Sequence, residues 1–414
     1  MKSYNWNPVF NLVMKIKSDY KETFGVFDTY KFEEWLLRLA KKEYNDIFCH
    51  LKVNQHKHFI LIRYGMDEMH ESMWTDSRSI FRECRSVVID IVNEHLVLAP
   101  FRKFFNLNEV EENKIENIQN KIKSTKSIEI TDKLDGSMQC ARYYDGDIFI
   151  SGSMALDRSN SWRLEDGYAK LTENHRAMIA ENSDYTFIFE YISIKDVHVV
   201  VYSPDQEGMY LIGMRNVFTG RQLPYKEVLD YASRFGVPMT KIENRCFEEV
   251  MQDVKRFKSS EKEGWVLNID GHMIKLKCDD YVELHRVLNR FSSINTIIRN
   301  IADGTYDDLI SKVPENYRER INRAAKIIYD YMKNMNERIE AYFNKAPKED
   351  RKEYMIWVTN NCPKEIQGFL RQKYLKEEYH VLKTCYANST KYKKINEMGL
   401  EQTYTALFAD LEEA

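Results

Sequence analysis

Hydrophobic positions near the N-terminus follow a helical rhythm. Between residues 1 and 50 apolar side chains recur at intervals of three and four, and the clearest stripe comprises Phe32, Trp35, Leu36, Leu39 and Ala40. Such spacing places the apolar side chains on one face of an α-helix. We therefore predict helices in this segment, with the stripe packed into a core.

The pattern changes to short β-like runs further along the chain. The runs HFILIRY, SVVIDIV and LVLAPFRKFFN fill residues 58–107, and a charged, amide-rich stretch at 111–127 predicts a helix followed by a loop. Strand-like segments such as FIFEYIS and MYLIGMR dominate 128–278, with an irregular stretch at 155–185 and a helix with a proline-bearing loop at 225–239. This texture predicts a mixed α/β domain.

Two hairpins can be placed from their turns. Asp145-Gly146 separates MQCARYY from DIFISGS, and Asp270-Gly271 separates GWVLNI from HMIKLK. A type I′ turn needs positive φ at both central residues, so Asp-Gly between β-formers is a strong hairpin signal.

After residue 280 the periodicity is helical. The longest stripe runs through 315–343, with Pro314 at the predicted first turn, and comprises Tyr317, Ile321, Ala324, Ile328, Met332, Met335, Ile339 and Tyr342. Further helices are predicted at 348–358, 363–386 and 391–411. We place a domain boundary near residue 285, with a mixed domain at 1–285, its first 55 residues a helical extension, and an all-helical domain at 286–414.

Composition narrows the class of protein. The chain has 414 residues and a net charge of −3, which excludes binding to nucleic acid by bulk charge but not through a local basic groove. Its seven cysteines are odd in number and form no CxxC pair, which argues against a disulfide framework or a zinc site and fits a reducing cytosol. No signal-like or membrane-spanning run is evident, so a cytoplasmic protein with no membrane partner is expected.

Charged residues at regular intervals carry the candidate chemistry. Lys133 opens the segment KLDGS directly before the first hairpin, and Glu190 lies among apolar residues in FIFEYIS. Glu263 begins EGWV, and Lys275 and Lys277 share one face of the last strand because side chains alternate with period two. Taken singly, each of these charged residues is more typical of a solvated strand face than of a functional site.

The second hairpin fixes a register. A two-residue turn pairs Lys275 with Val266 and Lys277 with Gly264, which leaves room for a ligand's backbone approach at the glycine. Glu263 then falls on the opposite face unless a bulge intervenes or the strand has already ended there.

Together these segments resemble a known family. KLDGS, FEY, EGWV and KLK, in that order, are similar to the nucleotidyltransferase motifs of ATP-dependent ligases and capping enzymes. ECRS at 83–86 and KFFNLNE at 103–109 resemble segments of the RNA ligases of the T-even bacteriophage tRNA-repair type. The resemblance covers about residues 58 to 285. It implies an α/β (α+β) nucleotidyltransferase domain with antiparallel sheets, followed by an all-α C-terminal domain.

The resemblance also implies roles for the matched residues. Lys133 would be the nucleophile that becomes lysyl-AMP, and Lys275 and Lys277 would bind the α-phosphate of ATP. Glu263 would hold Mg²⁺, with Mn²⁺ as an alternative, and Glu190 would hold the ribose or the metal. The remaining nucleotide-binding positions would be Arg85, Lys103, Phe105, Asp135, Gly136 and Gly264, with Phe105 shaping the pocket. The implied substrate is RNA, above all a tRNA with a broken anticodon loop, and the implied state is a monomer.

Lysine chemistry adds one expectation. An attacking amine must be neutral, whereas a free lysine has a pKa near 10.4. We expect Lys275, Lys277 and a bound metal to depress the pKa of Lys133, and the same cations to stabilise charge on the phosphate.

Two positions depart from the family pattern. Leu134 replaces an acidic residue at a variable position, and Ser151-Gly152-Ser153 aligns with a Lys-Gly-Ser element, so one basic contact is missing. Arg142 or Arg158 are candidates to replace it.

The C-terminal region shows helical periodicity where DNA ligases and capping enzymes continue into an OB-fold. Asp307 and Asp308 are candidates for a second divalent ion, although acidic residues complementing a helix dipole are the favoured interpretation. Two basic clusters could contact tRNA phosphates or equally be solvated faces: Arg318, Arg320 and Arg323, and Lys391, Lys393 and Lys394 with Tyr392. His56 and His58 are interpreted as surface residues.

Three functions therefore stand as hypotheses. The first is an RNA ligase, the second a DNA-joining or capping nucleotidyltransferase, and the third an RNA-binding protein with a decayed ligase site. Labelling by ATP separates the third from the others, and competition between RNA ends, nicked DNA and GTP separates the first two.

Overall fold

The computed structural model describes residues 3–42, 50–65, 72–75, 79–196, 198–289, 291 and 294–383. The chain divides into two compact units, Met1–Val282 and Glu283–Ala414. Within the described residues, no helix is both long and apolar enough to cross a bilayer.

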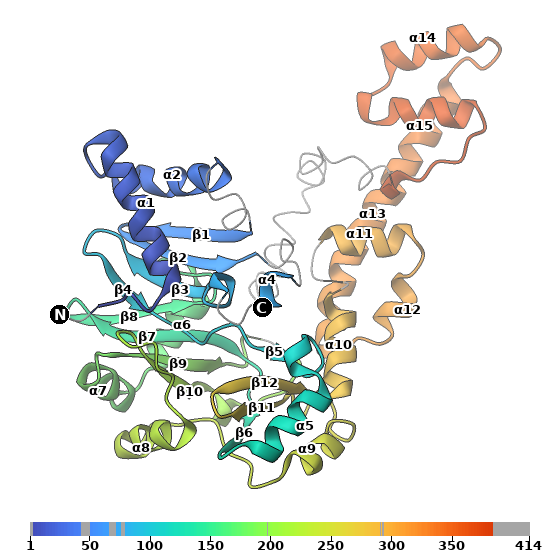
Figure 1. The fold of residues 1–414 in the computed structure, drawn as a ribbon. Coiled ribbons are helices and arrows are strands. Elements are labelled where there is room, and N and C mark those ends of the chain that lie inside the picture. The colour runs from blue at the N-terminus through green and yellow to red at the C-terminus, as the bar shows by residue number, and fades with distance from the viewer. Residues whose placement is uncertain are drawn as a thin grey trace. The chain divides into compact units, whose positions relative to one another are not determined.

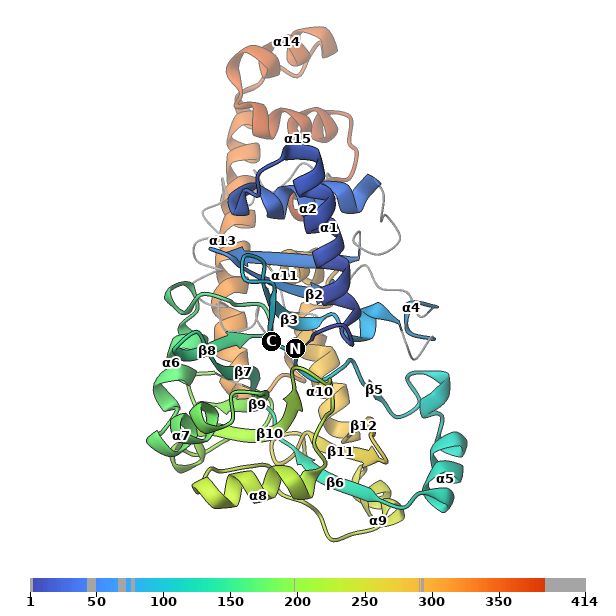
Figure 2. The ribbon, with the colours of Figure 1, turned by 60° about the vertical axis from the view of Figure 1, so that its left-hand side comes forward.

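Three four-stranded sheets form the framework of the first unit (Figure 1, Figure 2). The first has the antiparallel order β1(Leu51–His56), β2(Phe59–Tyr64), β3(Arg85–Asp90), β4(His95–Leu98). The second is also antiparallel, in the order β10(Gly208–Asn216), β9(Tyr185–Ile192), β7(Ser137–Tyr144), β8(Asp147–Gly152). The third has the order β5(Phe105–Asn106), β12(His272–Lys277), β11(Gly264–Ile269), β6(Ile128–Lys133), with only β5 parallel to its neighbour.

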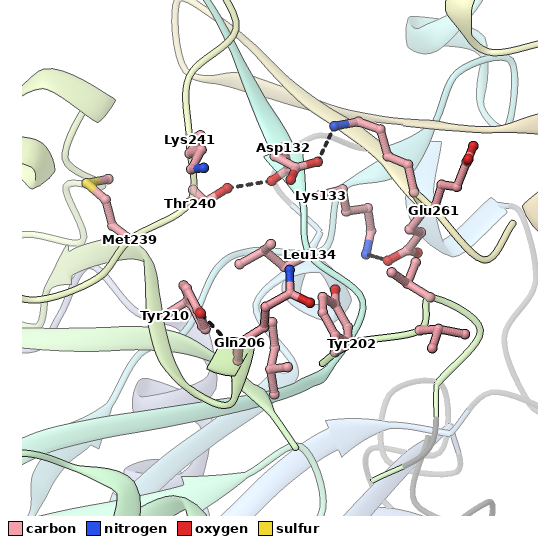
Figure 3. A pocket seen from close by; sticks show the side chains of 15 residues that line it. Asp132, Lys133, Leu134, Tyr202, Gln206, Tyr210, Met239, Thr240, Lys241 and Glu261 are labelled. Atoms are coloured by element: carbon pink, nitrogen blue, oxygen red, sulfur yellow. Dashed lines mark hydrogen bonds and ion pairs between the residues drawn. The ribbon is translucent and has the colours of Figure 1, made fainter. Parts of the chain in front are cut away.

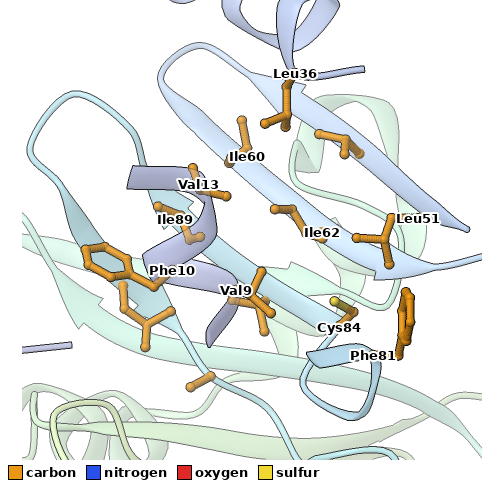
Figure 4. Packing of buried hydrophobic residues seen from close by; sticks show 14 of the residues in the cluster. Val9, Phe10, Val13, Leu36, Leu51, Ile60, Ile62, Phe81, Cys84 and Ile89 are labelled. Atoms are coloured by element: carbon orange, nitrogen blue, oxygen red, sulfur yellow. The ribbon is translucent and has the colours of Figure 1, made fainter. Parts of the chain in front are cut away.

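Helices cover the outer faces of these sheets. They are α1(Pro8–Phe24), α2(Thr29–Lys42), α4(Ser72–Thr75), α5(Ile115–Ser124), α6(Trp162–Lys170), α7(Glu173–Glu181), α8(Tyr225–Phe235) and α9(Phe247–Asp253), and α10(Asp279–Asn289) begins at the end of the unit. Val9, Phe10 and Val13 of α1 pack against Ile60 and Ile89 of the first sheet (Figure 4). The predicted N-terminal stripe is confirmed as core at Phe32 and Leu36, which are fully buried, and Trp35 packs partly buried against the same core, whereas the side chains of Leu39 and Ala40 lie outside the described residues.

Both predicted hairpins are confirmed. Asp145-Gly146 joins β7 to β8 and Asp270-Gly271 joins β11 to β12, and φ is positive at all four turn residues. The predicted register is also confirmed, with Lys275 opposite Val266 and Lys277 opposite Gly264.

One stretch was predicted wrongly. Residues 155–185 are not irregular, because they contain α6 and α7. Each helix has only nine residues and is started by a side-chain cap: Ser161 accepts from the amide of Leu164, and Thr172 from that of His175. Two such short helices offer too few turns for their periodicity to stand out.

The described part of the second unit is helical. Its helices are α11(Ile294–Ala302), α12(Tyr306–Ile310), α13(Glu315–Lys345), α14(Arg351–Asn361) and α15(Lys364–Tyr374). The predicted stripe on α13 packs into the core, where Ile321, Ile328 and Ile339 are almost fully buried. The predicted helix at 363–386 is shorter than expected, ending at Tyr374, and the one predicted at 391–411 lies outside the described residues.

A mixed α/β domain with antiparallel sheets followed by a helical region is therefore confirmed as the fold class.

Candidate active site

KLDGS carries the chain from the third sheet to the second. Lys133 is the last residue of β6, and Ser137 is the first of β7. Lys133 also lies in one row across the third sheet with Gly264 of β11 and Lys277 of β12. The two lysines thus flank a glycine where the two sheets meet.

Gly264 is required by the packing of its own strand. Its φ is +150°, and a Cβ atom there would lie 2.1 Å from the carbonyl oxygen of Leu276. Any side chain would push β11 away from β12 and disturb the row. This close approach of the two strands explains why the position is a glycine. The predicted contact of Gly264 with a nucleotide stays a prediction.

Glu263 bridges the two lysines from just outside β11. Its Oε2 lies 2.5 Å from Nζ of Lys133, and its Oε1 lies 2.9 Å from Nζ of Lys277. The strand begins only at Gly264, so Glu263 escapes the alternation that would turn it to the opposite face. Burial alone would raise the pKa of this carboxyl, but the two ammonium groups outweigh burial and hold its pKa below the usual value.

The expected depression of the Lys133 pKa is wrong for this arrangement. Burial lowers the pKa of Lys133, but the carboxylates of Glu263, Glu190 and Asp135 raise it further than burial lowers it. Because Glu263 is interposed between Lys133 and Lys277, the amine responds to the near carboxylate more than to the cation beyond it.

Lys275 has the low pKa instead. Burial and the positive charges of Arg85, Lys103, Lys133 and Lys277 place its pKa well below the usual value. The Phe104 ring lies between two of these cations, 5.0 Å from the Arg85 guanidinium and 4.9 Å from Nζ of Lys275.

Arg85 also keeps an unused donor. Its buried Nη1 has no hydrogen-bond partner among the described residues. An unpaired buried donor is costly unless an acceptor is supplied. Beside a second cation with a depressed pKa, it suits an anionic ligand.

Glu190 faces the same region from β9. Phe189 and Tyr191 point to the side covered by α6, α7 and α8, so the residue between them points to the other side. Its Oε1 accepts from the amide of Gly136 at 3.0 Å. Burial raises the pKa of Glu190 to about 7, against the opposing effect of Lys133.

The close approach of the loop to β9 also requires a glycine at position 136. A Cβ atom there would lie 2.4 Å from the carbonyl oxygen of Tyr191. Only a glycine lets the KLDGS loop approach β9 this closely.

Asp135 anchors the loop from below. Its buried carboxylate accepts from the hydroxyl of Tyr281 at 2.9 Å and from the amide of Val200 at 2.9 Å, while its own amide donates to the hydroxyl of Tyr202. Burial, together with Glu263, raises the pKa of Asp135. The structure thus gives Asp135 a positioning role beside Lys133.

Sequence reasoning missed a second buried group. Asp196 accepts from Ser137 at 2.6 Å and from Arg163 at 2.8 Å, and lies 3.0 Å from His198. These residues come from β7, α6 and the loop after β9, so no spacing along the chain relates them. The serine of KLDGS was the only available signal.

Five of the charged residues described above line a cavity of about 240 Å³. Its polar wall carries Arg85, Lys133, Glu190, Lys275 and Lys277. Its apolar wall comprises Phe101, Phe104, Met138, Ile212, Val266 and Met273. Cationic and apolar side chains lining one cavity suit a ligand with a phosphate chain and a flat base.

Five of the residues predicted to bind or act on the nucleotide lie outside this cavity lining: Asp135, Glu263 and Gly264, described above, and Lys103 and Phe105. Phe105 is 2% exposed and belongs to the core around α1, so Phe104 is the aromatic residue that shapes the cavity. Lys103 lies within 5.0–5.7 Å of the ring centroids of Tyr64, Trp74 and Phe105 and lines a neighbouring cavity of about 250 Å³. Its charge still lowers the pKa of Lys275.

Neither arginine proposed to replace the missing basic residue lines the cavity. Arg142 donates to the carbonyl oxygens of Leu96, Val97 and Ser183, which makes it structural. Arg158 lies 3.8 Å from the Tyr168 ring centroid and pairs with Glu165. Ser151 itself is buried on β8, away from the cavity lining.

The donor set fits a hydrated divalent cation. Glu190 and Glu263 interact electrostatically across the cavity region, and no group of three or more His, Cys, Asp or Glu residues suited to a metal occurs in the part of the chain that the structure describes. Mg²⁺ keeps several waters and commonly uses one or two carboxylates together with substrate phosphates. Glu190 lines the cavity with its cationic side chains, and Glu263 contacts two of these, Lys133 and Lys277, so two carboxylates stand near the proposed phosphate position.

The other candidates show no such gathering. Asp307 and Asp308 are exposed in the first turn of α12, which agrees with the helix-dipole interpretation. His56 lies 3.5 Å from Asp157, and His58 lies 3.6 Å from Asp90. Arg318 and Arg323 pair with Glu315 and Glu319; the side chain of Arg320 and the whole cluster at 391–394 lie outside the described residues.

The fold is a mixed α/β domain with antiparallel sheets, in which the KLDGS lysine lies where two sheets meet. Residues 83–281, just under half of the chain, match the model of the family described as RNA ligase.

Known proteins give a partial match. A protein of Autographa californica nuclear polyhedrosis virus, named "Putative bifunctional polynucleotide kinase/RNA ligase", is 25% identical over 253 residues, which cover 56% of this chain and 35% of that protein. The chain thus spans about a third of that relative's length.

Solved structures of Naegleria gruberi RNA ligase are more distant. The one with PPi is 16% identical with a TM-score of 0.36, covering 44% of this chain and 57% of that one. A mutant form with ATP and Mn is 17% identical with a TM-score of 0.33, covering 42% and 56%. Likenesses this loose carry no argument about the site.

Proposed function

We propose that this chain is an ATP-dependent RNA ligase that joins a 5′-phosphate to a 3′-hydroxyl. The observation that carries the proposal is the position of Lys133, which lines a cavity whose wall holds three further cations, within a region that matches the RNA ligase family model.

ATP fits the cavity in one orientation. The base would lie against the apolar side chains of Ile212 and Val266, and the phosphates against Arg85, Lys275 and Lys277. The unpaired Nη1 of Arg85 would gain an acceptor, and the cluster of like charges would gain a counter-charge. Ligand binding would thus relieve two unfavourable features of the protein.

In the first step, the Lys133 ammonium loses a proton to solvent, and the lone pair of Nζ attacks the α-phosphorus of ATP. A P–N bond forms, the bond to the β-phosphate oxygen breaks, and pyrophosphate leaves. Glu263 holds Nζ in place, and Lys275 and Lys277 would stabilise the charge that develops on the phosphate oxygens. Mg²⁺ or Mn²⁺ held by Glu190 and Glu263 would supply positive charge that offsets these carboxylates and lowers the pKa of Lys133.

Two transfers complete the reaction. An oxygen of the RNA 5′-phosphate attacks the same phosphorus and the P–N bond breaks, which returns the lysine. A 3′-hydroxyl then attacks the 5′-phosphate phosphorus, forms the phosphodiester and releases AMP. The amine is therefore regenerated in every cycle.

The finer expectations belong to this proposal as well. A tRNA with a broken anticodon loop as the substrate, a monomeric state and a cytoplasmic location stay predictions. The helices described from 294 to 374 support an RNA ligase over a DNA-joining or capping enzyme, since those enzymes continue into an OB-fold.

The test is covalent labelling. The purified chain with Mg²⁺ and ATP labelled at the α-phosphate should give an acid-labile adduct that pyrophosphate reverses. Lys133→Ala should abolish the adduct, with a loss of at least about a thousandfold. Lys126→Ala, an exposed lysine just before the same strand, should label like the wild type.

Circular dichroism confirms that both variants are folded. An undiminished adduct in Lys133→Ala would refute the nucleophile assignment. A folded wild-type chain that takes no label would remove the ligase proposal and favour an RNA-binding protein. RNA ends, nicked DNA and GTP, offered in competition, identify the true substrate.

A further inference from the structure

A second cavity opens beside the first. It has a volume of about 390 Å³, and Asp132, Lys133, Leu134 and Thr240 belong to the walls of both cavities (Figure 3). Lys133 therefore stands between two spaces, of which the proposed ATP site occupies one.

Most of the charged side chains that line this second cavity form ion pairs with one another. Three lysines face three carboxylates there. Lys133 pairs with Glu263, and Lys262 pairs with Asp132. Lys241 is exposed at the rim and forms no ion pair with any described residue. Lys241 and the exposed Glu261 are thus the two charged side chains of the wall that form no ion pair with a described residue, and of these Lys241 has the charge that suits a phosphate.

Two tyrosines give the cavity its aromatic surface. The hydroxyl of Tyr202 accepts from the amide of Asp135 at 2.8 Å, and the hydroxyl of Tyr210 donates to the carbonyl oxygen of Gln206 at 2.9 Å. In the view of Figure 3, Leu134 and Gln206 lie between the two tyrosines. The rings are anchored by their hydroxyls, and both rings contribute to the cavity wall.

We infer that this cavity receives the terminal nucleotide of an RNA end, with its base on Tyr210 and its phosphate backbone at Lys241. The inference rests on the proposed ligase function. An RNA end must reach the phosphorus held on Lys133 from a side that ATP does not fill, and this cavity shares that lysine. A fixed aromatic ring with one free cation is a sequence-tolerant way to hold a single-stranded nucleotide.

The test separates the first step from the later ones. Tyr210→Ala and Lys241→Ala are compared with the wild type in three assays: labelling by α-labelled ATP, transfer of AMP to a 5′-phosphorylated single-stranded RNA, and sealing of a pre-adenylated RNA. Tyr210→Phe keeps the ring, and Lys226→Ala removes an exposed lysine of α8 that lines neither cavity. Both serve as controls.

We expect labelling to stay within twofold in both test variants, while transfer or sealing falls by about fivefold or more, the lower end of what one stacked base contributes. Loss of transfer alone assigns the cavity to the 5′-phosphate end, and loss of sealing alone assigns it to the 3′-hydroxyl end.

Other outcomes overturn the inference. A parallel loss of labelling would assign the cavity to ATP, and unchanged transfer and sealing in both test variants would exclude RNA from it; both leave the ligase proposal standing. A wild type that takes no label removes both proposals. If Tyr210→Ala fails to fold, Lys241→Glu, at an exposed position, replaces it, and its transfer or sealing should fall more than that of Lys241→Ala.

Discussion

Two lysines on one strand face experience opposite surroundings. Lys275 and Lys277 are two residues apart on β12, so they point the same way. Lys277 meets the carboxylate of Glu263 at 2.9 Å, whereas Lys275 meets the Phe104 ring and the charges of Arg85 and Lys103. The alternation along β12 determines which way the two lysine side chains point, and the residues around them determine which charges they meet. One end of the cavity is therefore neutralised internally, and the other is left poised for an anion.

Among the substitutions that test this comparison, removal of the Glu263 carboxylate should have the largest effect. Glu263→Gln leaves Lys133 and Lys277 without their shared buried acceptor, and loss of one partner from a buried pair costs about 3–5 kcal/mol. We expect that destabilisation in urea unfolding near neutral pH, with adenylation reduced about a hundredfold or more.

Glu261→Gln is the matched control. Its carboxylate is exposed two residues earlier, so stability should change by no more than about 0.5 kcal/mol. Equal stability of both variants would show that the bridge contributes nothing to the fold.

The pH dependence of stability tests the carboxylate facing the cavity from β9. A folded-state pKa of about 7 for Glu190 lies above the unfolded value of about 4.5, so the folded state binds the extra proton between these values. This contribution is full below pH 4.5 and is lost as the pH rises through 7, by about 3 kcal/mol at most. Glu190→Gln should lack that decline.

The measurement is urea unfolding of both chains across this pH range. Parallel stability curves for wild type and variant would contradict the raised pKa.

Replacing each lysine separately sharpens the comparison. Lys277→Met removes a partner of Glu263 and should destabilise the fold by about 1–2 kcal/mol. Lys275→Met removes a cation held among like charges and should leave stability unchanged or raise it. Both variants should lose adenylation. Thermal unfolding decides the matter, and equal destabilisation of the two would show that the surroundings do not differ in energy.

The smallest effect separates two adjacent aromatic residues. Phe104→Leu should raise the KM for ATP several-fold with little loss of stability, because its ring lines the cavity. Phe105→Leu should cost about 1 kcal/mol in unfolding with KM nearly unchanged, because its ring lies in the core. Steady-state adenylation and urea unfolding of the pair distinguish them, and a reversal would return Phe105 to the site.

The sequence predicted features that depend on local geometry. Asp-Gly turns determined both hairpins, and the turn at Asp270 determined which residues oppose Lys275 and Lys277. It did not predict which aromatic side chain of KFFNLNE faces the cavity, because the strand β5 has only two residues and its alternation is too short to be recognised.

Electrostatic surroundings were harder to predict. The spacing of the lysines did not reveal that Glu263 lies between two of them, since this depends on β11 beginning only at Gly264, one residue after Glu263. The group around Asp196 joins three separate segments, and only the folded chain brings them together.

The hydrogen bond between Tyr281 and Asp135 bears on how far this unit can be trimmed. Tyr281 lies on α10, past the last motif lysine by four residues, yet its hydroxyl reaches the aspartate two residues after Lys133. A fragment ending at Lys277 would contain every motif and still lose this support. We therefore expect the shortest autonomous form of this unit to extend at least one helical turn beyond its recognisable sequence signature.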